Sequence, residues 1–82
     1  MTTEQRIQFV RRTILDQVKS ARSYLLPDSI LVSAVKIICD ETELFIREQI
    51  KWLEAERMIV QTENELGIRK WKITDLGRTV ET

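Results

Sequence analysis

The side chains available for chemistry in this sequence are almost entirely acids and bases, because the usual catalytic groups are scarce. The 82 residues contain no histidine and one cysteine, Cys39. Histidine is the commonest general base and metal ligand, and zinc sites require several Cys or His residues. The sequence therefore excludes Ser-His-Asp triads and zinc hydrolysis, and we expect no metal and no cofactor. Cys39 lies in an apolar run, which favours a buried, inert thiol.

The 13 acidic residues do not indicate an enzyme either. No pair of carboxylates lies in a recognisable pocket motif, and acids in a small domain ordinarily form a solvated surface. With Gly67 and Gly77 as the only glycines, the sequence has no phosphate-binding loop and no dinucleotide fingerprint. We expect the protein not to be an enzyme.

The basic residues are unevenly distributed although the net charge is zero. Residues 1–25 and 67–82 are both net positive, whereas residues 26–66 carry four basic against nine acidic side chains. Dedicated DNA-binding domains usually have a pI above about 9, and the sequence pI here is about 6.3. Strong binding to DNA by a monomer is therefore not expected, but local basic clusters keep nucleic acid as a candidate partner.

Hydrophobic periodicity predicts the elements that position these charges. The composition, 43% apolar and 32% charged, predicts one folded domain over residues 1–82. Apolar residues spaced by threes and fours predict helix one over about 4–23, helix two over about 28–39 and helix three over about 41–57, the last opened by a capping box of Asp40 and Glu43. One core is expected to contain Ile14, Val18, Val35, Ile38, Ile46, Ile50, Leu53 and Trp71.

A β-hairpin is predicted after the third helix. Two β-prone runs, 58–63 and 68–73, flank a turn composition at 64–67, and Thr74 is placed to cap a short turn or helix over 75–81. A minimal strand is also possible near residues 24–26. The predicted fold class is α+β, mostly α, with three helices followed by a two-stranded wing over about 58–73.

Two motifs resemble those of winged helix-turn-helix regulators. Ile50-Lys51-Trp52-Leu53-Glu54 followed by Met58-Ile59-Val60 resembles their "L-x-x-L-E-x-x-G-L-V" passage, and Ile73 to Arg78 resembles "L-T-x-x-G-R". The Trp52-Leu53-Glu54 version is also similar to small winged-helix proteins of Mu-like phages. Arg57 stands where the family has glycine, which suggests a different end to helix three.

The resemblance implies that helix three enters the major groove of double-stranded DNA, where Arg47 and Lys51 contact guanine or phosphate. Arg69, Lys70 and Lys72 in the wing are candidates for phosphate or minor-groove contacts. An equally weighted alternative for helix three is a solvated face with an ion pair between Glu43 and Arg47. For the wing, alternating charge that protects an exposed edge is the alternative.

Three aromatic residues are assigned by their angular positions on the helices. Phe9 lies opposite the apolar stripe of helix one and is a candidate contact of a homodimer, although a single exposed Phe is common. Phe45 and Trp52 share one edge of helix three, where core packing beneath the wing, beside Trp71, is favoured over a ligand cage.

Two functions follow as hypotheses. The first is a small DNA-binding transcription regulator, and the second is a winged helix that binds a protein, as in a phage or mobile-element accessory factor. No apolar run has the length of a membrane span and the N-terminus lacks the pattern of a signal peptide, so we expect a cytoplasmic protein without membrane contact.

Overall fold

The computed structural model describes residues 2–21, 26–63 and 66–79. In chain order the elements are α1 (Thr3–Ser20), β1 (Leu26–Pro27), α2 (Asp28–Cys39), α3 (Glu43–Ala55), β2 (Ile59–Glu63), β3 (Arg69–Ile73) and α4 (Asp75–Thr79). The described part is thus α+β and mostly helical, as predicted. Predictions that fall on residues 22–25, 64–65 and 80–81 lie outside the described residues.

The start of α3 differs from the prediction. Thr42, not Asp40, is the N-cap, and its hydroxyl accepts a hydrogen bond from the Phe45 amide at 3.2 Å. Asp40 instead ends α2 in the left-handed conformation, with φ +53°. Asp and Thr both favour helix caps, but Asp also tolerates left-handed backbone, which a capping spacing does not reveal. The predicted Asp40–Glu43 capping box is therefore wrong.

The other end of α3 closes with the arrangement of hydrogen bonds that a glycine usually completes. The amide of Arg57 donates to the Glu54 carbonyl and the amide of Met58 donates to the Leu53 carbonyl, which together make a Schellman motif. Arg57 has φ +62°. The expectation that Arg57 indicates a different helix end is wrong, because the arginine adopts the left-handed conformation itself.

A closely packed junction joins the turn after α3 to the residues that follow β3. The Thr74 hydroxyl lies 2.6 Å from the Arg57 carbonyl oxygen and 2.9 Å from that of Met58, and it accepts a hydrogen bond from the Gly77 amide at 3.1 Å. Gly77 is buried, and a Cβ there would overlap the Met58 carbonyl oxygen and lie 2.9 Å from Ile73 Cγ1. Thr74 and Gly77 therefore have a packing role at this junction.

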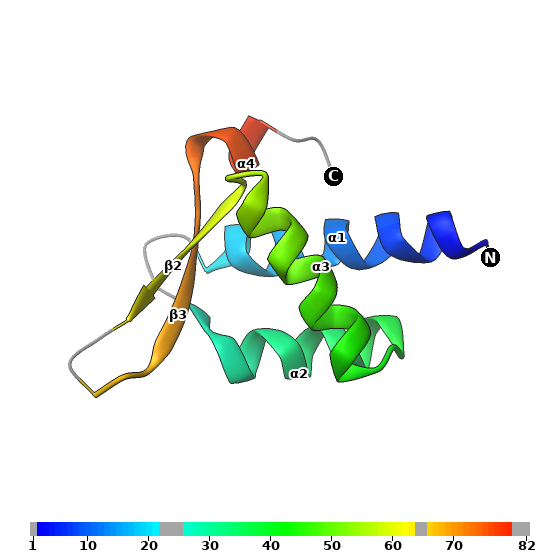
Figure 1. Ribbon diagram of the computed structural model, residues 1–82, viewed down its shortest axis with the longest axis horizontal. Helices are drawn as coiled ribbons and strands as arrows, with labels where there is room; N and C mark the ends of the chain where they lie inside the picture. Colours follow the sequence, from blue (N-terminus) through cyan, green and yellow to red (C-terminus); the bar gives the residue numbers. More distant parts are fainter. Residues whose placement is uncertain (1, 22–25, 64–65, 80–82) are drawn as a thin grey trace.

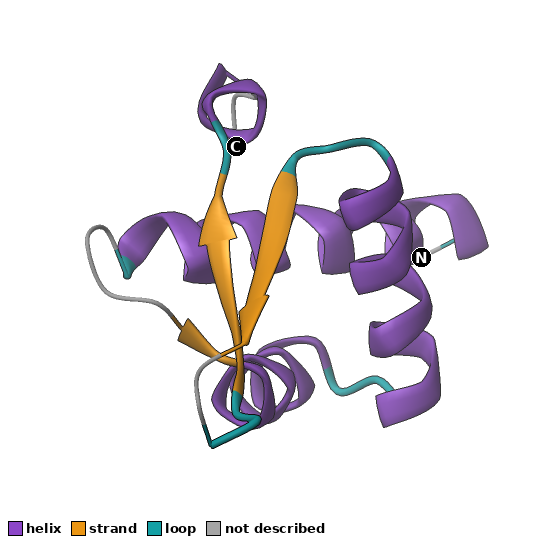
Figure 2. Cartoon of the chain, turned by 60° about the vertical axis from the view of Figure 1, so that its left-hand side comes forward, coloured by secondary structure: helices purple, strands orange, loops and turns teal. Residues whose placement is uncertain are grey.

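The sheet is antiparallel, with strand order β1-β3-β2. Ile59 pairs with Ile73 and Glu63 with Arg69, while the two-residue β1 adds Leu26 opposite Trp71 on the other side of β3. Figure 1 shows the β2–β3 hairpin extending away from the helices, with α2 at the lower edge of the molecule, and Figure 2 shows the strands from another side, in front of α1.

One core lies between the first three helices and the sheet. Seven of the eight predicted core residues are buried, with Ile14, Val35 and Ile46 fully so. Ile38 is the exception, with 49% of its surface exposed. It lies seven residues after the buried Leu31, on the same side of α2, but in the last turn. Because packed helices cross at an angle, the buried side at one end of a helix need not be the buried side at the other.

Candidate functional site

A groove between α3 and the sheet brings together three of the five predicted DNA-binding residues. Its cavity volume is about 110 Å³. Arg47 and Lys51 enter it from α3, one turn apart, and Arg69 enters it from β3. The remaining lining residues are Asp28, Ile50, Glu54, Gln61 and Trp71. The groove therefore combines predicted cations with two carboxylates.

Arg47 is held by carboxylates of its own chain. Its Nη1 donates to Asp28 Oδ2 at 2.9 Å, and its Nε donates to Glu43 Oε2 at 3.3 Å. The hydrogen bond to Asp28 is the main cause of a raised pKa for Arg47. Asp28 also accepts a hydrogen bond from Nε1 of the buried Trp71 at 2.9 Å. The predicted pair with Glu43 is present, and Asp28 adds a partner 19 positions away that the helical spacing could not indicate.

Lys51 and Arg69 are the exposed cations of the groove, and neither forms an ion pair within the described residues. Their charges are accessible to an anionic group without breaking an internal contact. Glu54 lies one turn beyond Lys51 on the same side of α3 and lowers the net positive charge of the groove.

The pleat of β3 separates the three basic residues predicted for the wing. Arg69 shares its face with Trp71, toward α3, whereas Lys70 and Lys72 alternate onto the opposite face. On that face Lys70 pairs with Thr62 and Lys72 with Val60. Lys72 borders a second hollow of about 340 Å³ together with Val60, Ile73, Thr74, Asp75 and Arg78. One ligand at the α3 groove is therefore not placed to contact all five residues.

The other side of α3 contacts α1 through two arginines. Arg6 donates to both carboxylate oxygens of Glu41, at 2.8 and 2.6 Å, and its guanidinium carbon lies 5.1 Å from the centre of the Phe45 ring. Arg11 donates to Gln49 Oε1 at 2.8 Å and lies 3.5 Å from the centre of the Trp52 ring.

These contacts revise the assignment of Phe45 and Trp52. Both were expected to pack in the core beneath the wing. Phe45 is partly buried and packs against the core, with Arg6 of α1 over its ring, whereas Trp52 is 38% exposed beneath Arg11 of α1. Burial lowers the pKa of Arg11, because desolvation disfavours its charged form. Helical angles placed the two aromatic residues on one edge of α3, but no pattern within α3 could identify the arginines of α1 as their neighbours.

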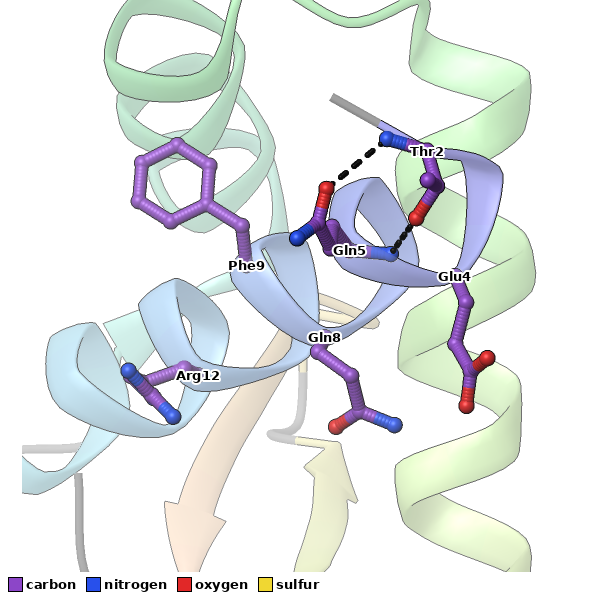
Figure 3. A pocket seen from close by; sticks show the side chains of 6 residues that line it. All are labelled: Thr2, Glu4, Gln5, Gln8, Phe9 and Arg12. Atoms are coloured by element: carbon purple, nitrogen blue, oxygen red, sulfur yellow. Dashed lines mark hydrogen bonds between the residues drawn. The ribbon is translucent and has the colours of Figure 1, made fainter.

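Phe9 is exposed, as predicted from its position opposite the apolar stripe of α1. It borders a hollow of about 540 Å³ with Thr2, Glu4, Gln5, Gln8 and Arg12, all from α1. Figure 3 shows these side chains diverging from the helix, with Phe9 and Glu4 pointing in different directions. Thr2 and Gln5 bond to each other as the capping box of α1. This open surface has no set of converging polar groups, and the dimer contact at Phe9 stays a prediction.

Among the described residues, no group of three or more His, Cys, Asp or Glu side chains is arranged to hold a metal ion. Within the same ranges no helix is both long and apolar enough to cross a membrane. Comparison with protein-family models, curated proteins and solved structures finds no match to this chain. Its function must therefore be inferred from its own geometry.

Proposed function

We propose that the chain is a small winged-helix domain that binds double-stranded DNA through the groove between α3 and the sheet. The observation that supports this function best is the meeting of Lys51 and Arg69, two exposed cations from separate elements, beside Arg47 in one groove. The element order, with a short β1 before α2 and a hairpin after α3, is the order expected of a winged helix.

The charges divide this interface into two parts. Lys51 and Arg69 can contact phosphate oxygens without breaking an internal ion pair, whereas Arg47 must exchange its contact with Asp28 for one with DNA. Lys70 and Lys72 extend the positive charge onto the outer face of the hairpin. Because phosphate contacts carry no sequence information, this arrangement supports binding with modest sequence preference. Any sequence-specific contact with a base is then made by Arg47.

The test is an NMR titration of the full chain with a short duplex at low and moderate salt. Shifts are expected at Lys51, Arg69 and their neighbours. Replacing either residue with Ala should flatten the slope of log affinity against log salt by about 0.9 for each phosphate that the variant no longer neutralises. Lys19 is an exposed lysine in the last turn of α1, and Lys19→Ala is the matched control. This variant should change neither the duplex-dependent shifts nor the slope of log affinity against log salt. Absence of duplex-dependent shifts at low salt would exclude DNA binding.

A second candidate is a protein-interaction module that uses the outer side of α3. It is favoured by the neutralisation of Arg47 and by the exposed Glu48, which lies one turn from Leu44, itself 71% exposed. A basic partner with an apolar contact for Leu44 fits that surface. In the titration above, this candidate predicts no response to DNA, and Lys51→Ala and Arg69→Ala should then have no measurable effect with any duplex.

A further inference from the structure

A positively charged surface lies on the outer face of the hairpin, away from the α3 groove. It consists of Lys70 and Lys72, which share one face of β3, and of Arg78 in α4. Lys72 and Arg78 line the same hollow of about 340 Å³, where Asp75 is the only carboxylate among the described lining residues. Lys70, Lys72 and Arg78 together are called the outer basic surface.

The positive charge of the outer basic surface is not balanced by internal ion pairs. In the part of the chain that the structure describes, none of its three basic residues pairs with a carboxylate, and Asp75 does not pair with Arg78 three positions away. The α3 groove also contains three basic residues, but it contains two carboxylates as well, and its Arg47 is already paired. The outer basic surface is therefore the more strongly positive of the two.

The two surfaces are separated in two directions. The pleat places Arg69 on the face of β3 toward α3 and Lys72 on the opposite face. Lys72 also lies three residues further along the strand, which corresponds to about 10 Å, and Arg78 follows in α4. Figure 1 shows β3 running from the far end of the hairpin to α4. A ligand in the α3 groove therefore lies on the other side of the sheet from Lys72 and Arg78.

The chemistry of the outer basic surface favours a polyanion over a small anion or a protein. Lys72, Asp75 and Arg78 are exposed, so the hollow is open to solvent. Exposed ion pairs contribute little singly, whereas a nucleic-acid backbone gains affinity at each phosphate by releasing counterions. Val60 is the only exposed large apolar residue among the described lining residues. Interfaces with proteins have an apolar core, whereas those with DNA are more polar and more positively charged.

We propose that the outer basic surface binds a second segment of double-stranded DNA while the α3 groove holds the first. Duplex DNA is stiff over about 150 base pairs, so one short duplex in the α3 groove does not bend around the sheet to reach Arg78. The domain therefore bridges two duplexes or two distant parts of one DNA molecule. This inference rests on the proposed function, because it takes DNA binding at the α3 groove as given.

A bridging assay with the full chain at low salt tests the proposal. A short duplex is immobilised and saturated with protein, unbound protein is washed away, and the capture of a second, fluorescent duplex is measured. The unmodified chain should capture the second duplex. Arg78→Glu should reduce the capture by about tenfold, because it replaces a phosphate contact with a repulsive charge. Lys36→Glu is the matched control, since it makes the same change of charge at an exposed lysine of α2, outside both surfaces, and should keep the capture.

The outcomes separate this inference from the proposed function. If the unmodified chain does not bind the immobilised duplex, both fail. If it binds that duplex and captures no second one, the bridging alone is wrong. The two variants should bind the immobilised duplex equally well. Capture that persists in Arg78→Glu would also overturn the proposal, since a dimer of the chain with one duplex on each copy would then be the cause.

An NMR titration of the double variant Lys51→Ala, Arg69→Ala locates the second contact. This variant removes the two exposed cations of the α3 groove, so the shifts caused by a short duplex at low salt should be concentrated at Lys72, Arg78 and their neighbours. A poly-glutamate peptide of the same total charge serves as the comparison and should cause smaller shifts. Shifts of Lys72 and Arg78 with the peptide but not with the duplex would identify an acidic protein segment as the partner and overturn the proposal.

Discussion

The two ends of α3 are fixed in place by different kinds of contact. At its N-terminal end, charged side chains from other elements are bonded: Arg6 of α1 bonds to Glu41, just before the N-cap Thr42, and Asp28 of α2 bonds to Arg47. In the turn that follows its C-terminal end, backbone atoms and small side chains meet, with Thr74 bonded to the carbonyl groups of Arg57 and Met58 and Gly77 packed against Met58.

The contacts between charged side chains at the N-terminal end can rearrange, whereas the close packing at the C-terminal end cannot. Long side chains can change partner, so the N-terminal end should respond to pH, salt and ligands. Close backbone packing has no such freedom, and interiors at native density tolerate little added volume. The proposed DNA contact at Arg47 belongs to the adjustable end.

Gly77→Ala should have the largest effect on stability. The new methyl group would overlap the Met58 carbonyl oxygen, which is backbone and cannot move aside cheaply. We expect a loss of about 3 kcal/mol in the free energy of unfolding, measured by urea denaturation. The control is Gly67→Ala, where the nearest atom is a side-chain oxygen at 3.6 Å and φ is +76°. There only backbone strain of about 1 kcal/mol is expected, and equal losses in the two variants would remove the contrast.

Asp28→Ala should cost about 2 kcal/mol, because it leaves the buried Trp71 indole N–H without its acceptor. Asp28→Asn retains an oxygen for Trp71 and loses only the ion pair with the partly exposed Arg47, so its loss should stay below about 1 kcal/mol. Urea denaturation measures both. If the DNA proposal holds, Asp28→Asn should also bind duplex DNA more tightly, since it frees Arg47 and removes a negative charge from the groove. Equal losses in Asp28→Ala and Asp28→Asn would show that the bond to Trp71 contributes nothing.

Arg57→Gly should stabilise the protein by about 0.5 to 1 kcal/mol. Arg57 has φ +62°, where a side chain is strained and glycine is not. The Schellman hydrogen bonds involve only backbone and should persist. Glu56→Gly, one position earlier at φ −82°, should lose a comparable amount, because there glycine adds only chain entropy to the unfolded state. A destabilised Arg57→Gly variant would show that the arginine side chain contributes more than its backbone strain costs.

Glu41→Gln should have the smallest effect and the clearest dependence on pH. The hydrogen bond from Arg6 is the main cause that holds the pKa of Glu41 below its ordinary value. A carboxylate with a depressed pKa stabilises the fold above its unfolded pKa of about 4.3, and this contribution disappears as the pH falls through the folded value. The thermal midpoints of the two proteins should therefore differ at neutral pH and converge in acid. The exposed Glu48, replaced by Gln, should show no such convergence.

Periodicity identified the helices and the two main strands because each buries one continuous face. It failed at Ile38, which lies on the buried side of α2 but in its last turn, where the crossing angle of packed helices takes that side out of the core. The start of α3 was misplaced because Asp40, Glu41 and Thr42 offer two capping residues in succession. Arg57 was misinterpreted because backbone hydrogen bonds offset the strain of its left-handed conformation, and residue types alone do not indicate such hydrogen bonds.

The candidate site was predicted less completely than the fold. The groove unites Arg47, Lys51 and Arg69 because the face of the sheet that carries Arg69 and Trp71 borders α3, and alternation along β3 explains why Lys70 and Lys72 face away. The Asp28–Arg47 and Arg11–Trp52 contacts join residues distant in the sequence. Such pairs depend on the tertiary arrangement, which a single sequence does not specify.

Pro27 has a consequence for how the molecule opens. It is both the last residue of β1, paired with Lys70, and the N-cap of α2. The edge strand of the sheet and the first turn of α2 thus share one residue. Neither element can open without disturbing the other. We expect the backbone amides of Trp71 and Val32 to exchange with solvent deuterium through one common opening, with equal protection, so that sheet and helix unfold as a single cooperative unit.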